Sequence, residues 1–127
     1  MKTLTVVGLV VRDYDEAIRF YTDKLGFTVS EDVTLGEDRW VVLSLPDSGQ
    51  TGIGLDLART EEDLAVVGNQ AGSFPLFGLG TDDCLGEYRR MKERGVVFHG
   101  EPQSEPWGTG VLLEDLYGNM IYLNQEP

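Results

Sequence analysis

The chain has 127 residues, of which 41% are hydrophobic and 25% charged, and its formal net charge is −12 at pH 7. This composition predicts one folded globular protein, and the negative charge argues against nucleic acids and anionic membrane surfaces as partners. The sequence has no apolar run near the ~20 residues that span a bilayer, no signal-peptide pattern and only one cysteine, so we expect a cytoplasmic protein without a disulfide.

Residues 6–27 predict a strand, a helix and the start of a second strand. The apolar run from Val6 to Val11 is typical of a buried strand. We expect Asp13 or Asp15 to cap the helix, and Gly26 to end it in the left-handed conformation. Apolar side chains recur at helical spacing and give this helix one buried face: Tyr14, Ala17, Ile18, Tyr21 and Leu25.

Three strands and a connection complete the first half of the chain. The strands are expected at residues 27–33, 39–45 and 53–57, with turns at 35–38 and 46–49. The order is therefore β-α-β-β-β. Residues 58–72 predict an exposed connection in which Thr60 starts a short helix, and glycines then break that helix.

The same order returns in the second half. We expect strands at 74–79, 96–98, 110–114 and 120–123, a helix after the caps Thr81, Asp82 and Asp83, and a loop at 100–106. Cys84 lies on the apolar stripe of this helix, which favours a buried, unreactive thiol. Landmarks recur after roughly 66 to 68 residues, which indicates an internal duplication. They pair Val6 with Phe74, Tyr21 with Tyr88, and Asp56 with Tyr122.

Several short motifs resemble those of the vicinal oxygen chelate superfamily, which contains glyoxalases, bleomycin-resistance proteins, extradiol dioxygenases, epimerases and fosfomycin-resistance enzymes. The motifs are Val11-Arg12-Asp13, Phe20-Tyr21, Leu25-Gly26-Phe27, Gly95-Val96-Val97-Phe98, Glu105-Pro106-Trp107-Gly108 and Asp115-Leu116-Tyr117-Gly118-Asn119. The resemblance implies an α+β fold in which two tandem βαβββ modules, 1–57 and 73–127 with a linker at 58–72, curl eight strands into an incomplete barrel. It also implies a ligand cleft and a homodimer. Turns, caps and core positions make up these motifs, so they specify the fold better than the activity.

In this superfamily most chemistry runs through a divalent metal held by His, Gln and Glu. The resemblance places the four ligand positions at Val6, Asp56, Phe74 (or Ser73) and Tyr122. Valine and phenylalanine offer no donor atom, and a phenol is normally protonated near neutral pH. One carboxylate cannot supply three or more ligands, so we predict no metal and no cofactor.

A cleft without metal ligands would have apolar and aromatic walls, unless the aromatic side chains simply fill it as core. The expected ligand-binding residues are Val6, Trp40, Asp56, Phe74, Trp107 and Tyr122, with Asp56 and Tyr122 as orienting polar groups. The only histidine, His99, is expected at the surface or the cleft rim.

Two functions are open at this point. The first is metal-free sequestration of a small organic ligand, a cationic aromatic one in particular, as in the bleomycin-resistance members that the chain resembles. The second is a metal-independent isomerase or lyase in which Asp56 is the base and Tyr122 or His99 the acid. A divalent-metal glyoxalase or dioxygenase has the least support.

Overall fold

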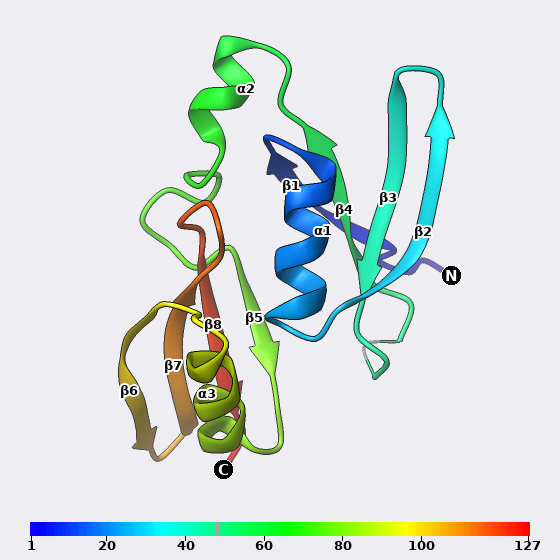
Figure 1. Ribbon diagram of the computed structural model, residues 1–127. Helices are drawn as coiled ribbons and strands as arrows, with labels where there is room; N and C mark the ends of the chain where they lie inside the picture. The colour runs from blue at the N-terminus through cyan, green and yellow to red at the C-terminus, as the bar shows by residue number, and fades with distance from the viewer. Residues whose placement is uncertain (48) are drawn as a thin grey trace. The chain divides into compact units, whose positions relative to one another are not determined.

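The computed structural model describes residues 1–47 and 49–127, and these form two compact units, Met1–Val67 and Gly68–Pro127. Each unit has its own four-stranded sheet and its own ten-residue helix (Figure 1). The predicted turn at 46–49 includes Ser48, which lies outside the described residues. The predicted order of elements is confirmed in both halves. None of the described helices is long and apolar enough to cross a membrane.

The first unit carries four strands and two helices. They are β1 (Val6–Val11), α1 (Tyr14–Asp23), β2 (Thr28–Leu35), β3 (Asp38–Ser44), β4 (Gly52–Leu57) and α2 (Glu61–Val66). The strand order is β1-β4-β3-β2, with β1 parallel to β4 and the other neighbours antiparallel. Helix α2 begins after Thr60, whose side chain accepts a hydrogen bond from the backbone N–H of Asp63, as the sequence predicts.

Helix α1 lies across one face of this sheet (Figure 1) and forms the core of the unit with it. The buried side chains come from alternate strand positions and from one helix face: Leu9, Val11, Ala17, Tyr21, Val41, Leu43, Ile53 and Leu55. The Tyr21 ring packs edge-on against Phe27, with 5.5 Å between ring centroids. We call the opposite side of each sheet, turned away from its ten-residue helix, the helix-free face.

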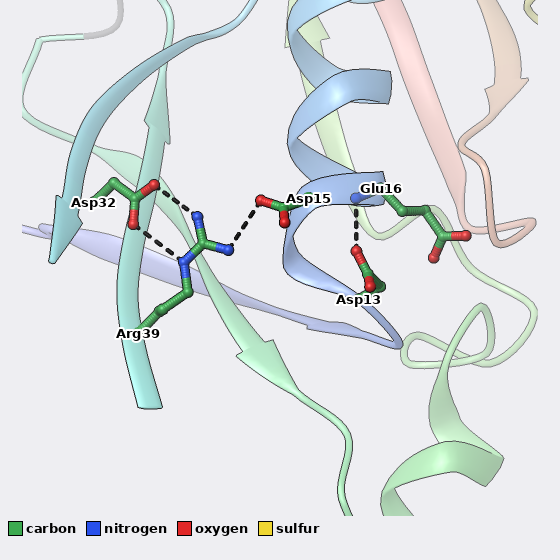
Figure 2. Close-up of polar contacts among 5 residues, drawn as sticks. All are labelled: Asp13, Asp15, Glu16, Asp32 and Arg39. Carbon is green, nitrogen blue, oxygen red and sulfur yellow. Dashed lines mark hydrogen bonds and ion pairs between the residues drawn. The ribbon is translucent and has the colours of Figure 1, made fainter. Parts of the chain in front are cut away.

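Two carboxylates at the start of α1 have different tasks (Figure 2). The Asp13 carboxylate caps the helix, because its Oδ1 accepts a hydrogen bond from the Glu16 N–H at 2.9 Å. Asp15, the alternative cap, instead accepts a hydrogen bond from Arg39 of β3 at 2.9 Å. Gly26 follows the helix at φ +81°, the left-handed conformation predicted for it.

Arg39 joins α1 to two strands (Figure 2). Its guanidinium donates two hydrogen bonds to Asp32 of β2, with Nη2 to Oδ2 at 2.7 Å and Nε to Oδ1 at 3.2 Å, besides the bond to Asp15. The hydrogen bond from Arg39 lowers the pKa of the Asp32 carboxyl from its ordinary value. This bidentate geometry ties Arg39 firmly to the fold of the first unit.

We expect Arg39→Met to lower the free energy of unfolding by about 1 kcal/mol at pH 7, the upper range for exposed ion pairs. Because the pKa of Asp32 is lowered in the folded state, its contribution is complete above the ordinary aspartate range and is lost as the pH falls through the lowered value. The difference from the parent protein should therefore shrink as the pH falls below the ordinary aspartate pKa of about 3.9. Urea unfolding between pH 7 and pH 2.5 measures it.

Arg59→Met is the matched control, because Arg59 makes a single ion pair with Asp38 in which both side chains are more exposed. Its effect should be smaller, below about 0.5 kcal/mol. Equal losses for the two variants, or an Arg39→Met loss that persists in acid, would contradict the assignment.

The second unit repeats this plan. Its elements are β5 (Phe77–Gly80), α3 (Cys84–Glu93), β6 (Phe98–Glu105), β7 (Gly108–Glu114) and β8 (Met120–Gln125), with strand order β5-β8-β7-β6. Asp83 caps α3 by accepting a hydrogen bond from the Gly86 N–H at 3.0 Å. The buried side chains are Leu79, Cys84, Tyr88, Met91, Val111, Leu113, Ile121 and Leu123. Burial raises the pKa of the Cys84 thiol, which agrees with the unreactive core residue predicted for it.

Strands β5 and β6 differ most from their predicted ranges, 74–79 and 96–98. Strand β5 begins at Phe77 rather than at Phe74; Pro75 has no N–H to donate, and the first bond to β8 runs from the Leu76 N–H to the Met120 carbonyl at 2.7 Å. Strand β6 continues through most of the predicted loop at 100–106. Its pairing with β7 is interrupted between His99 and Gln103, and this bulge accommodates Gly100, at φ +92°, together with a proline.

The internal repeat has a spacing of about 70 residues for α1 and α3, β2 and β6, and β3 and β7. The connection before the last strand is shorter in the second half, which changes the match there. In the parallel ladders Val10 pairs with Asp56, whereas Gly80 pairs with Asn124. Asp56 therefore corresponds to Asn124, and the predicted match of Asp56 with Tyr122 is wrong. By the same spacing Val6 corresponds to Leu76, not to Phe74.

Candidate functional site

Tyr122 lies on the helix-free face of the second sheet. Its neighbours Ile121 and Leu123 are buried against α3, so alternation turns Tyr122 to the other side, as predicted. A Cβ atom placed on Gly110 of β7 would overlap the Tyr122 ring and hydroxyl, which shows that the ring lies directly over this glycine. The ring can occupy this position only because residue 110 has no side chain.

Glycine also borders Tyr122 on its other side. Gly78 of β5 is its direct partner in the ladder, and Gly80 is the partner of Asn124. A Cβ atom on Gly80 would meet nothing within 4 Å. The backbone is therefore bare at Gly80, whereas the Asn124 side chain lies close to Gly78 and Leu112 is the neighbour of Tyr122 on β7.

A small pocket of about 120 Å³ lies at one end of this face. It is lined by Trp107, Gly108, Thr109, Tyr122, Asn124, Gln125 and Glu126. Trp107 stands in the turn between β6 and β7 and is 72% exposed. The pocket therefore combines two aromatic rings with amide and carboxylate groups, a lining suited to a flat molecule with a polar edge.

His99 shares this face with Tyr122. It pairs with Leu112, and Leu112 pairs with Tyr122, so the three side chains form a row across β6, β7 and β8. The His99 Nε2 atom lies 2.6 Å from Oε2 of Glu114, two positions along β7 on the same side. The sequence predicted a surface or rim position for His99, but it gave no indication of Glu114.

The helix-free face of the first sheet carries the other predicted residues. Asp56 of β4 lies over Gly8 of β1, because a Cβ atom on Gly8 would be 3.1 Å from the Asp56 Oδ2 atom. Val6 lies over Gly54 in the same way. Trp40 of β3 is on this face too, and its Nε1–H donates a hydrogen bond to the Glu31 carboxylate at 2.8 Å. This face presents an indole, the side chains of Val6 and Val42, and two carboxylates.

The structure thus separates the predicted ligand-binding residues into two groups. Val6, Trp40 and Asp56 belong to the first unit, and Trp107 and Tyr122 to the second. Phe74 precedes β5 and is 72% exposed, so it is no strand residue of the second sheet. Trp40, Phe74 and Trp107 are all exposed in the described chain, which excludes the alternative that they are core residues.

The donor atoms do not fit the divalent metal that the fold family implies. Val6 and the register equivalent Leu76 carry no donor, and the other two equivalent positions hold one carboxylate, Asp56, and one amide, Asn124. The Tyr122 hydroxyl and ring lie over Gly110. Among the described residues of either unit, no three His, Cys, Asp or Glu side chains gather as a cation site. We derive no step through a metal.

Sequence comparisons identify relatives of nearly the same length. The chain is 44% identical to an uncharacterised protein of Shewanella frigidimarina (strain NCIMB 400), over 98% of this chain and 93% of the relative. It is 36% identical to the uncharacterised protein YurT of Bacillus subtilis (strain 168), over 97% and 98% of the two chains.

Solved structures share the whole fold. UcmS2 matches with a TM-score of 0.86 and 32% identity over 98% of both chains. TnmS3, described as an antibiotic binding protein from Streptomyces sp. CB03234, matches with a TM-score of 0.80 and 28% identity over 100% of this chain and 98% of its own. A family model covers residues 3–123. The chain belongs to the glyoxalase/bleomycin resistance protein/dioxygenase superfamily.

Proposed function

We propose that this protein binds a flat organic molecule against the Tyr122 face of the second unit and holds it without chemical conversion. The single observation that carries the proposal is the Tyr122 ring, which lies over Gly110 and is bordered by Gly78 and Gly80. An aromatic ligand can stack on such a ring without displacing neighbouring side chains. The pocket beside Trp107 would receive one edge of the ligand.

Two further observations support this function. TnmS3, which shares the fold at 28% identity, is described as an antibiotic binding protein. The whole chain carries a net charge of −12. Negative charge around an aromatic site favours a cationic ligand. We therefore propose a planar aromatic cation as the preferred ligand; Val6, Trp40 and Asp56 stay predictions for the helix-free face of the first unit.

Isothermal titration with three probes tests the proposal. Proflavine is a planar aromatic cation, 2-methoxynaphthalene is neutral and naphthalene-2-sulfonate is an anion. We expect binding in the order cation, neutral molecule, anion, with the preference for the cation reduced by salt. Tyr122→Ala should weaken proflavine binding at least about tenfold, because stacking on an aromatic side chain is worth roughly 1–3 kcal/mol.

The matched control is Tyr14→Ala, which removes a tyrosine of α1 that packs beside Arg39 on the helix side of the first sheet. Its affinity for proflavine should equal that of the parent protein. No heat with any of the three probes would contradict the proposed function. Equal weakening by Tyr122→Ala and Tyr14→Ala would place the ligand elsewhere.

The proposal includes metal independence and a homodimer. Affinity for proflavine should be unchanged after exhaustive treatment with EDTA, because no chelatable ion takes part. Sedimentation equilibrium should give twice the chain mass of 14.1 kDa. If EDTA treatment lowers the affinity and added divalent cations restore it, metal independence is wrong. If the protein is a monomer at micromolar concentration, the homodimer is wrong.

A further inference from the structure

The His99–Glu114 pair lies on the face that we propose as the ligand site. The His99 Nε2 and Glu114 Oε2 atoms are 2.6 Å apart, and the two residues stand on the adjacent strands β6 and β7. The backbone there is fixed, because the Glu114 N–H donates to the Val97 carbonyl at 2.9 Å. The pair is partly exposed, with side-chain exposures of 48% for His99 and 32% for Glu114, so a ligand can reach it.

The carboxylate determines which nitrogen of the imidazole carries the proton. An ionised carboxylate only accepts hydrogen bonds, so the Nε2 atom that faces Glu114 must be the donor. In the neutral ring the proton is then on Nε2, and Nδ1 presents a lone pair. No residue in the described part of the chain donates a hydrogen bond to His99 Nδ1. The ring therefore offers an acceptor that the protein itself does not use.

This acceptor lies within the reach of a ligand stacked on Tyr122. His99, Leu112 and Tyr122 occupy one row across three strands, which puts His99 about 10 Å from Tyr122 at ~4.8 Å per strand. Leu112 between them is an apolar floor. A fused aromatic ring system that covers Leu112 would bring a substituent at its far edge to the imidazole.

We infer that His99, oriented by Glu114, selects planar aromatic ligands that carry a phenolic or enolic hydroxyl, by accepting the hydrogen bond of that hydroxyl at Nδ1. The inference rests on the proposed function and adds the chemical class of the ligand. Glu114 is a positioning residue, since it acts through the imidazole. No bond of the ligand is made or broken.

The tautomer can be measured directly. His99 is the only histidine of the chain, so protein labelled with ¹⁵N-histidine gives one pair of ring nitrogen signals. In the neutral ring of the free protein we expect the proton on Nε2. Glu114→Gln should shift the population toward Nδ1–H, because a glutamine amide can donate to Nε2. Protonation mainly at Nδ1 in the parent protein would overturn the inference.

Ligand selection is tested with 2-naphthol and 2-methoxynaphthalene, in which a methyl group replaces the hydroxyl hydrogen. The parent protein should bind 2-naphthol about tenfold more tightly, the value of one hydrogen bond. His99→Phe and Glu114→Gln should abolish this preference and leave the affinity for 2-methoxynaphthalene unchanged. Glu101→Gln, which removes one negative charge from the same strand as His99, should keep the tenfold preference.

The outcomes separate the two proposals. Equal affinity of the parent protein for both probes would overturn the role of His99 and leave the stacking site standing. Failure to bind either naphthalene while proflavine still binds would overturn the choice of ligand class, and failure to bind proflavine as well would overturn the proposed function. A preference that survives His99→Phe would assign the hydroxyl to another acceptor.

Discussion

Asp115→Ala is expected to lower the free energy of unfolding by about 3 kcal/mol, because it leaves buried hydrogen-bond donors without a partner. The Asp115 carboxylate accepts hydrogen bonds from the backbone N–H groups of Tyr117 at 2.9 Å and Asn119 at 3.0 Å. It also accepts one from the Asn119 side-chain amide at 2.9 Å. Both Asp115 and Asn119 are buried, so water does not replace these bonds in the folded state.

Urea unfolding followed by circular dichroism measures this loss. Asp82→Ala is the matched control, because it removes a carboxylate of the same charge from an exposed position in the same unit. Its effect should stay within about 0.5 kcal/mol. A loss below about 1 kcal/mol for Asp115→Ala would show that the turn between β7 and β8 rearranges to satisfy its own donors. This turn aligns the strands that carry Gly110 and Tyr122, so its loosening should also weaken ligand binding.

Gly110→Ala is expected to reduce the affinity for 2-methoxynaphthalene at least about tenfold and to cost roughly 1–3 kcal/mol of stability, as overpacked positions do. The added methyl group would overlap the Tyr122 ring, which must then rotate off the sheet. Gly110 is not among the glycines with positive φ, so alanine fits the backbone here. The effect would therefore come from the displaced ring and not from backbone strain.

A double variant tests this explanation. If Gly110→Ala acts only through the tyrosine ring, then combining it with Tyr122→Ala should weaken binding no further than Tyr122→Ala alone. Isothermal titration of the two single variants and the double variant completes the cycle. Additive losses would mean that Gly110 contributes to the site independently of Tyr122.

The fold was largely predictable because its signals are local. Asp13 and Asp83 cap their helices through side-chain bonds to residues three positions later, and Gly26 ends α1 through its own backbone conformation. The predicted ends of strands were wrong where a proline lies in or next to the strand. Strand β5 begins only after Pro75. Strand β6 continues beyond the bulge after His99, although the sequence there is typical of a loop.

The candidate site was only partly predictable, because it depends on register between strands. Tyr122 faces the expected side, since alternation along one strand is a local property. Its contact with Gly110, by contrast, follows from the pairing of β7 with β8. The partnership of His99 with Glu114 depends on a bulge whose length no composition rule supplies. The connection before the last strand is also two residues shorter in the second half, so the repeat spacing falls from 70 to 68 residues there and Asp56 corresponds to Asn124, not to Tyr122.

Each described strand pairing joins two strands of the same half of the chain, and this affects how the chain folds. Neither sheet needs a strand from the other half, so the loops that must close during folding stay short relative to the whole polypeptide. The first sheet can assemble as soon as residue 57 has emerged from the ribosome, before the second half exists. The parallel pairings, β1 with β4 and β5 with β8, are the steps that close the longest loops. Each of them closes a loop within one half of the chain, and none spans the full length.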